Sequence, residues 1–433
     1  MAEKKRVAVV GGGWAGIAAA VEATKLGHDV TLFEMASQLG GRSRGIETAG
    51  IPLDNGQHIL IGAYAQTLAL LRTVGIDASE AFVRTPLRLI YPDGSGLHLM
   101  PGIPTLAFCT AVLRQRSWRV GERCALLGIA AGWGMNGFKC EPTWTVARLT
   151  HRLPRAIRDE LIDPLCIAAL NTCAIDASAS VFLRVLRDAL FFGPGSADLL
   201  LPRVGLSALL PIPAHRWLKE AGAAVKLRRR VRSLLADGDG WSLDGEHFQC
   251  AVLATTPVEA ARLAGGVAPA WSRTAAALRY EPIMTVYLHS EGARLAEPML
   301  ALRSDDRAPA QFVFDRGQLG GPKGLLAFVI SGARSWVDRG AEATSAAAIA
   351  QARVALGLSA TLVQTLTEKR ATFRCTPGLL RPAMHIADNL FAAGDHVDGP
   401  YPASLEGAVR SGQAAARAVT AGQIHKPALA LTA

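Results

Sequence analysis

The chain has 433 residues, of which 50% are hydrophobic and 19% charged, so it can bury a large core and divide into two domains. Its formal net charge is +10, but it lacks the motifs in which aromatic and basic residues alternate, so we expect no nucleic-acid partner. Seven cysteines form no CxxC pair and no metal-ligand spacing. This scatter indicates free thiols in a reducing cytosol and predicts no metal site. The N-terminus carries no apolar segment with a cleavage site, so we expect no signal peptide and a cytoplasmic location.

The first 34 residues carry the strongest local pattern. A β-branched run at 7–10 predicts a strand, residues 15–26 a helix and residues 29–33 a second strand. A glycine-rich turn, GGGWAG at 11–16, joins the first strand to the helix, and the acid Glu34 ends the second strand. A strand, glycine turn and helix followed by an acid at this distance is typical of a dinucleotide site.

Each residue of this turn has a physical role. Gly11 allows the tight turn, Gly13 lets the backbone approach a pyrophosphate, and Gly16 lets helix and strand pack closely. The helix N-terminus offers N–H groups and a positive dipole end to phosphates, and Glu34 is placed to accept hydrogen bonds from a ribose diol. The cofactor contacts predicted here are Gly11, Gly13, Trp14, Ala15, Gly16 and Glu34.

Residues 101–138 mix short apolar runs with arginines. The runs are too short to span a bilayer, which takes about 20 residues. Helices of this kind can lie in the interface of an anionic membrane with arginines at the headgroups. The alternative is ordinary core helices joined by a solvated basic loop. The side chains that suggest membrane contact are Arg114, Arg116, Trp118, Arg119, Arg123 and Trp133.

The nucleotide-binding pattern returns twice further along the chain. A helical stretch at 206–220 ends at Gly222 and leads to residues 223–235, and a buried-type strand follows at 249–255. Near the C-terminus a strand at 390–395 ends in Gly-Asp and leads to a helix at 404–419. The predicted fold is therefore α/β, with a discontinuous Rossmann-like domain and an α+β second domain. The boundaries are 1–80, 195–270 and 385–425 for the first domain, and 81–194 and 271–384 for the second.

Several motifs together resemble a known superfamily. GGGWAG, Glu34, GGRSR at 40–44 and the C-terminal AAGD…EGAVRSG are similar to the FAD-dependent amine oxidases and phytoene desaturases. More narrowly, LDNGQHILIGAY at 53–64, DLLLPRVGLSALLP at 198–211 and AAGDHVDGPYPASLEGAVRSGQAAA at 392–416 resemble the hydroxysqualene dehydroxylases of hopanoid biosynthesis. The resemblance covers the whole chain in order.

The resemblance implies FAD as cofactor and assigns it further contacts. Arg42, after Gly41, would contact the pyrophosphate, and Asp395 the ribitol and phosphate. Val231 would face the adenine. The helix that begins at Glu406, Gly407 and Ala408 would point its N-terminus at flavin N1 and O2, where a reduced flavin is negative. Gly56 and His58 would lie beside the isoalloxazine ring.

The activity implied is reduction of hydroxysqualene to squalene by hydride transfer from reduced flavin, with loss of water. The substrate would be a long-chain isoprenoid, and the protein would lie peripherally on the inner face of the cytoplasmic membrane; the electron donor is not identified. Segments 161–172 and 181–192 could line an apolar tunnel, although such stretches are more often plain core helices. Candidate proton donors for the leaving hydroxyl group are Asp54, His58, His396, Asp398 and Tyr401. Asp54 with His58 is the preferred catalytic choice, followed by His396 or Asp398, and for Asp54 and His58 a structural role is the alternative.

Three other functions fit the same motifs less closely. A polyprenyl desaturase would use the same fold and cofactor in the oxidative direction. An amine or protoporphyrinogen oxidase is disfavoured because aromatic residues make up 6% of the chain and Tyr401 is the single tyrosine of the C-terminal segment. A prenyl-lipid carrier of the same fold that binds no FAD would be expected to have lost Gly11, Gly13, Gly16, Glu34 and Arg42, which are present here.

Overall fold

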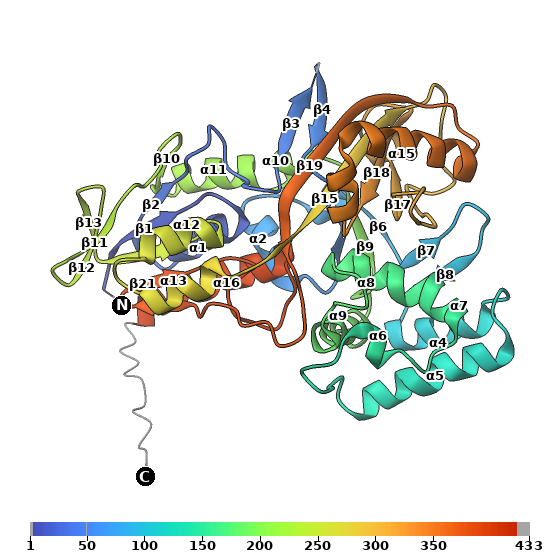
Figure 1. The fold of residues 1–433 in the computed structure, drawn as a ribbon. Coiled ribbons are helices and arrows are strands. Elements are labelled where there is room, and N and C mark those ends of the chain that lie inside the picture. The colour runs from blue at the N-terminus through green and yellow to red at the C-terminus, as the bar shows by residue number, and fades with distance from the viewer. Residues whose placement is uncertain (1–2, 49, 422–433) are drawn as a thin grey trace, which may run out of the picture.

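A six-stranded sheet organises one half of the molecule in the computed structural model, which describes residues 3–48 and 50–421 (Figure 1). Five neighbouring strands are parallel and the last is antiparallel. In spatial order they are β10 (Ala224–Lys226), β2 (Asp29–Phe33), β1 (Arg6–Val10), β14 (Cys250–Leu253), β21 (Leu390–Ala392) and β20 (His385–Ala387). The strands come from three separate parts of the chain, and residues 422–425 lie outside the described residues. The α/β fold class predicted from the sequence is confirmed.

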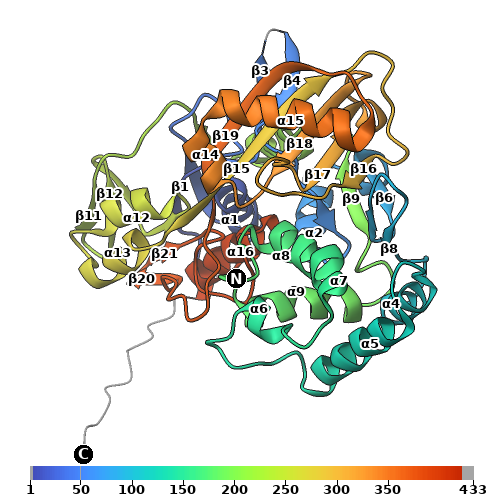
Figure 2. The same ribbon diagram turned by 45° about the vertical axis from the view of Figure 1, so that its right-hand side comes forward.

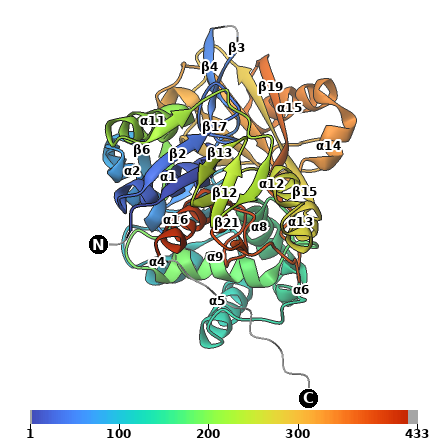
Figure 3. The same ribbon diagram turned by 90° about the vertical axis from the view of Figure 1, so that its left-hand side faces the viewer.

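Both faces of this sheet are covered. Along β1, Val7 and Val9 pack into a core with α1 (Trp14–Lys25), α11 (Pro211–Glu220) and α16 (Leu405–Ala421), whereas Ala8 and Val10 pack into a second core on the opposite face. Figure 3 shows α1 and α16 beside the sheet, although they lie at opposite ends of the described chain. A Cβ on Gly412 would lie 2.1 Å from the Ala15 oxygen, so glycine permits this close helix contact. The opposite core contains β11 (Leu234–Asp237), β12 (Gly240–Leu243), β13 (Glu246–Phe248) and α12 (Pro257–Ala264), and α13 (Pro269–Ala276) packs on α12.

The other half combines an antiparallel sheet with a group of helices (Figure 2). The sheet order is β16 (Met299–Ala301), β17 (Phe312–Asp315), β18 (Leu325–Ile330), β15 (Tyr280–His289) and β19 (Thr361–Phe373). Helices α14 (Arg334–Arg339) and α15 (Ala341–Leu356) cover one face. The helical part consists of α4 (Pro104–Arg114), α5 (Val120–Met135), α6 (Val146–Leu149), α7 (Arg155–Ile157), a π-helix (Arg158–Ile162), α8 (Asp163–Leu170) and α9 (Ala179–Phe191).

Short elements connect the two halves. A small sheet pairs β5 (Leu60–Ile61), β9 (Leu199–Pro202) and β6 (Phe82–Thr85), so it combines segments on both sides of the predicted boundary at residue 80. The remaining elements are β3 (Gly45–Thr48), β4 (Ile51–Asp54), α2 (Ala65–Thr73), α3 (Ala78–Ala81), β7 (Arg88–Ile90), β8 (Gly96–His98) and a 3-10 turn (Arg316–Leu319).

The helix predicted at 206–220 is two helices, α10 (Leu206–Leu209) and α11. Leu210 leaves the helical region, with φ −134° and ψ −52°, and Pro211 is the first residue of α11. Proline has no N–H for the preceding turn and disfavours a helical conformation in the residue before it. The apolar periodicity continues across the break, which is why the sequence predicts one helix.

Helices α4 and α5 lie at the periphery of the molecule (Figure 2). Leu126 is the single buried residue among the 16 of α5, although the helix is largely apolar. Two residues predicted to face a membrane are instead structural. Trp118 is 2% exposed and donates to Glu160 Oε2 at 2.8 Å, and Arg123 donates to the carbonyl oxygens of Leu113 and Trp118. Among the described residues, no helix has the length and apolar character needed to cross a bilayer.

Candidate functional site

A cavity of about 660 Å³ lies between the two halves, at the carboxyl ends of the parallel strands. It begins near Glu34 and Val231, passes the glycine turn, and ends among apolar side chains of α8, α9 and β15. Of the residues predicted to contact the cofactor, those on its wall are Gly11, Gly13, Trp14, Ala15, Glu34, Gly41, Arg42, Gly56, His58, Val231, Asp395 and Ala408.

One glycine of the turn borders open space that a ligand can occupy, and two others are packed against neighbouring backbone atoms. Gly11 has φ +106°, and a Cβ there would lie 2.5 Å from the Ala254 oxygen. A Cβ on Gly16 would lie 1.8 Å from the Gly11 oxygen. On Gly13, in contrast, an added Cβ would have the Gly41 Cα at 4.0 Å as its neighbour. Gly11 and Gly16 therefore allow the turn to pack, and Gly13 keeps the wall of the cavity open.

Glu34 is held by backbone donors at one end of the cavity. Its Oε2 accepts from Gly12 N and its Oε1 from Ala36 N, each at 2.7 Å, and the residue is 8% exposed. Each carboxylate oxygen retains a second lone pair. The arrangement can accept hydrogen bonds from the two hydroxyl groups of a ribose.

Arg42 and Asp395 meet on the cavity wall. Arg42 Nη2 lies 2.7 Å from Asp395 Oδ1, and Nη1 donates to the Ala371 oxygen at 2.6 Å. Burial opposes ionisation of Asp395, but the charge of Arg42 and the contact with His396 outweigh it and keep the pKa of Asp395 below its ordinary value. The pair places a fixed cation and a fixed anion beside the glycine turn, which suits a pyrophosphate and an adjacent polyol.

His58 has both ring nitrogens engaged. Nδ1 lies 3.3 Å from the Gly56 oxygen, which can only accept, and Nε2 lies 2.8 Å from Ser43 Oγ. These contacts assign the proton to Nδ1 and make Nε2 an acceptor of the Ser43 hydroxyl. Burial, supplemented by the charge of Arg42, lowers the pKa of His58 to about 4. The imidazole is therefore neutral at physiological pH, and it forms part of the cavity wall.

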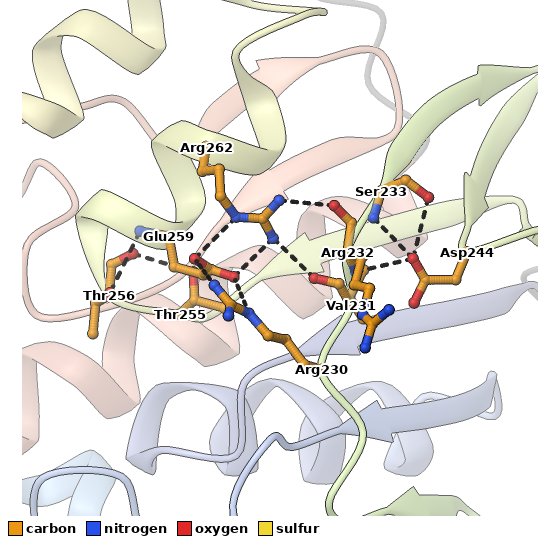
Figure 4. Close-up of polar contacts among 9 residues, drawn as sticks. All are labelled: Arg230, Val231, Arg232, Ser233, Asp244, Thr255, Thr256, Glu259 and Arg262. Carbon is orange, nitrogen blue, oxygen red and sulfur yellow. Dashed lines mark hydrogen bonds and ion pairs between the residues drawn. The ribbon is translucent and has the colours of Figure 1, made fainter.

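Figure 4 shows how the segment at the Glu34 end is fixed. Arg262 donates to the carbonyl oxygens of Val231 and Arg232 at 2.9 and 2.7 Å. Glu259 pairs with Arg262 at 2.8 Å and with Arg230 at 3.3 Å. This network holds the backbone of Val231 against the cavity, where adenine would bind.

Three of the predicted catalytic side chains point elsewhere. Asp54 is 4% exposed, and its Oδ1 accepts from Leu206 N at 2.8 Å while its Oδ2 lies 3.7 Å from Arg316. Asp54 thus caps α10, and burial raises its pKa. Asp398 is exposed on the surface, and His396 is packed into the protein at 2% exposure. These positions disfavour direct catalysis by any of the three.

Glu406 also has a structural role. Its carboxylate accepts from Gln66 N, Thr67 N and Thr67 Oγ1 at 3.2, 2.9 and 2.7 Å, and pairs with Arg410 at 2.6 Å. It therefore joins the N-terminus of α2 to α16. The N-terminus of α16 does border the cavity, through Leu405 and Ala408. The N-terminus of α16 therefore lies where the sequence predicts it, whereas the Glu406 carboxylate is directed to α2 and not into the cavity.

Sequence reasoning missed a polar cluster at the apolar end of the cavity. Asp188 lines the wall and pairs with Arg184 of the same helix, and Arg184 also contacts Tyr401. An Arg and Asp four residues apart on a helix are a recognisable signal. Their approach to Tyr401 is a tertiary contact that no local pattern reveals.

The donors and acceptors along this cavity fit FAD. Gly13 leaves space at the helix N-terminus, Glu34 can bind the adenosine ribose, and Arg42 can neutralise the pyrophosphate. The wall also carries apolar side chains of α8, α9 and β15. The fold and the site define a flavin-dependent oxidoreductase.

Comparisons with known proteins place it more narrowly. Residues 14–420 match the flavin containing amine oxidoreductase family. The hydroxysqualene dehydroxylase of Rhodopseudomonas palustris is 30% identical, covering 96% of this chain and 99% of the relative. That of Sinorhizobium fredii is 28% identical over 95% and 97%. An oxidoreductase structure from Methanosarcina mazei shares the fold, with a TM-score of 0.72, 15% identity and coverage of 94% of this chain and 99% of that one. The chain belongs to the flavin-containing amine oxidoreductase family, within which its full-length relatives are hydroxysqualene dehydroxylases.

Proposed function

We propose that this protein reduces hydroxysqualene to squalene. The observation that carries the proposal is the full-length similarity to hydroxysqualene dehydroxylases. The site supports it, because the FAD-binding part of the cavity continues into an apolar end that suits a hydrocarbon chain. The apolar lining there comprises Ile59, Ile61, Ala168, Ala169, Val185 and Ile283.

The reaction breaks the allylic C–O bond, forms a C–H bond and releases water. When bound and reduced, FAD supplies the hydride. The chain must exclude bulk water from the developing allylic cation, hold the alkyl chain in place and deliver a proton to the leaving oxygen. Side chains of α8 and α9 and strand β15 provide the apolar walls, and the halves of the molecule enclose them.

A substrate panel tests the proposal. Photoreduced holoenzyme is incubated without oxygen with hydroxysqualene, and the oxidised holoenzyme is incubated separately with squalene, phytoene or benzylamine. We expect squalene from the first mixture and no turnover in the others, as followed by mass spectrometry. Desaturated product from phytoene or squalene would favour the alternative, a polyprenyl desaturase, and oxidation of benzylamine would favour an amine oxidase.

We further propose that an anionic membrane delivers the substrate to the peripheral helices α4 and α5. We call their outer face, with the end of α9, the α4–α5 surface. Its apolar side chains are 53–84% exposed and comprise Ile103, Leu106, Leu113, Val120, Met135, Phe191 and Phe192. Thr105 Oγ1 donates to the Leu190 oxygen and Phe138 packs edge to face against Phe191, so α4 and the segment after α5 both adjoin the end of α9.

Positive charge beside these apolar side chains indicates an anionic partner for the α4–α5 surface. Arg114, Arg116 and Arg119 are exposed in the connection between α4 and α5. Arginines beside exposed apolar side chains match the headgroups and acyl chains of an anionic bilayer. Helix α9 then leads inward, because Phe191 lies on the surface while Asp188, one turn earlier, lines the cavity. We propose a peripheral position on the inner face of the cytoplasmic membrane.

A further inference from the structure

Tyr401 is held at the apolar end of the cavity by a side chain of α9, 217 positions away. Arg184 Nη2 donates to Tyr401 Oη at 3.3 Å, and Arg184 Nε lies 3.0 Å from each carboxylate oxygen of Asp188. Asp188 is 7% exposed, and both Asp188 and Tyr401 line the cavity. A tyrosine therefore borders the space assigned to the substrate.

The proposed reaction needs a proton donor, and two other ionisable side chains on the cavity wall, His58 and Glu368, are already engaged in hydrogen bonds. The proton of His58 is directed to the Gly56 oxygen, and its other nitrogen accepts from Ser43. Glu368 Oε1 accepts from Arg370 N and its Oε2 from Asn55 Nδ2, so both oxygens act as acceptors.

A second cavity tyrosine, Tyr64, has the less suitable surroundings. Burial, followed by the charge of Glu406, raises the pKa of Tyr64 to about 12. Tyr401 also has an anionic neighbour, Asp188, but two guanidinium groups lie near it, with the carbons of Arg184 and Arg410 at 5.0 and 5.2 Å from its ring centroid.

Two nearby cations partly offset the factors that hold the proton on Tyr401. Burial and the charge of Asp188 raise the pKa of Tyr401, and Arg410 and Arg184 oppose that rise. The phenol therefore remains protonated until a substrate hydroxyl takes the proton, and the phenolate that forms is stabilised by the two cations.

We propose that Tyr401 is the acid that protonates the departing hydroxyl group, with Arg184 and Asp188 as its positioning residues. The inference rests on the proposed dehydroxylation. The C–O bond breaks as the Tyr401 proton moves to its oxygen, and water leaves. The carbon accepts the hydride supplied by reduced FAD, and the phenolate regains a proton from solvent.

The test is a stopped-flow measurement on photoreduced holoenzyme mixed with hydroxysqualene, in which flavin reoxidation reports the reaction. Tyr401→Phe should keep its FAD and its affinity for hydroxysqualene, measured by titrating the flavin spectrum of the oxidised enzyme. Its reoxidation should be at least about 100-fold slower, the lower range for loss of a general acid. Asp188→Asn should slow the same step with affinity unchanged. Tyr91→Phe removes a phenol that donates to Glu160 outside the cavity and is the matched control.

A second substrate separates acid catalysis from a structural effect. The acetate ester of hydroxysqualene loses acetate, which needs no proton, so Tyr401→Phe and Asp188→Asn should react with it within about threefold of the parent rate. The proposal is overturned if Tyr401→Phe reduces hydroxysqualene at near the parent rate, or if Tyr401→Phe reacts no faster with the acetate ester than with hydroxysqualene. It is also overturned if Tyr64→Phe, with Tyr401 intact, abolishes the reaction. Failure of the parent holoenzyme with both substrates would instead refute the proposed function, and this inference with it.

Discussion

The guanidinium of Arg42 lies 2.7 Å from the carboxylate of Asp395, although 353 positions separate the two residues. The pair joins the loop after β2 to the segment after β21, and it also receives support from β19 through the Ala371 oxygen. Two segments of the discontinuous domain and one strand of the second domain thus meet at one ion pair on the cofactor wall. The contact has consequences for both stability and FAD binding.

Removing either partner should destabilise the protein in a pH-dependent way. The folded-state pKa of Asp395 is lowered, so its stabilising contribution is present above the unfolded-state pKa near 4 and is lost as pH falls below it. Arg42→Ala should lower the free energy of unfolding at pH 7 by about 1–3 kcal/mol, since part of the arginine is open to solvent. Urea unfolding at pH 7 and pH 3 measures both effects. The Arg42→Ala/Asp395→Asn double variant should lose less than the sum of the single losses; strict additivity would contradict a direct interaction.

Alanine substitutions in the glycine turn should separate folding from cofactor binding. Gly13→Ala places its Cβ in the open part of the cavity, so stability should change by no more than about 1 kcal/mol while the FAD dissociation constant rises at least about tenfold. Gly16→Ala drives its Cβ into the Gly11 oxygen and should cost about 3 kcal/mol or more. Thermal unfolding of apoprotein and FAD titration provide the two readouts. Equal loss of stability in both variants would place the pyrophosphate elsewhere.

The glycine turn and the acid that follows are also where the sequence predicted the site well. Local spacing determines how a strand, a turn and a helix meet, so Gly11, Gly13 and Glu34 lie on one wall as predicted. Local spacing did not predict the directions of individual side chains. Glu406 begins its helix near the predicted position, yet its carboxylate turns to α2, and Asp54 caps a helix 152 positions away.

The contact between Arg184 and Tyr401 shows what local sequence patterns do not predict. These residues are 217 positions apart, so their approach depends on how α9 packs against the segment that precedes α16. Similarly, the buried state of Trp118 depends on Glu160 from the π-helix. Composition and periodicity at 101–138 describe an amphipathic region but do not tell which of its aromatic residues enters the core.

His58 should remain neutral well below its usual titration range. Its folded-state pKa is lowered to about 4 from the ordinary 6.5, so the folded protein binds fewer protons than the unfolded chain between these values. Stability should therefore fall as pH drops from 6.5 toward 4, and His58→Gln should reduce this dependence. Nuclear magnetic resonance of ¹⁵N-histidine would report the titration and the Nδ1–H tautomer. A midpoint near 6.5 would contradict the burial and contacts described.

The α4–α5 surface should bind anionic vesicles. Ile103→Asp/Leu106→Asp should weaken co-sedimentation with phosphatidylglycerol vesicles at least about tenfold, because two apolar side chains lose their acyl-chain contact. Reversal of Arg114, Arg116 and Arg119 to Glu should weaken it comparably at low salt and less at high salt. Val354→Asp, at a position 83% exposed on α15, is the control. If neither the Ile103→Asp/Leu106→Asp variant nor the arginine-reversal variant binds vesicles more weakly, the α4–α5 surface is not the membrane-binding surface.

A single turnover with stoichiometric reduced enzyme tests the central claim most directly. Holoenzyme carrying one equivalent of reduced FAD is mixed anaerobically with excess hydroxysqualene, and flavin absorbance and squalene mass are followed together. We predict one squalene formed for each flavin reoxidised, and none from the oxidised holoenzyme. Flavin that stays reduced while hydroxysqualene is recovered unchanged would contradict the assignment of this chain as a dehydroxylase.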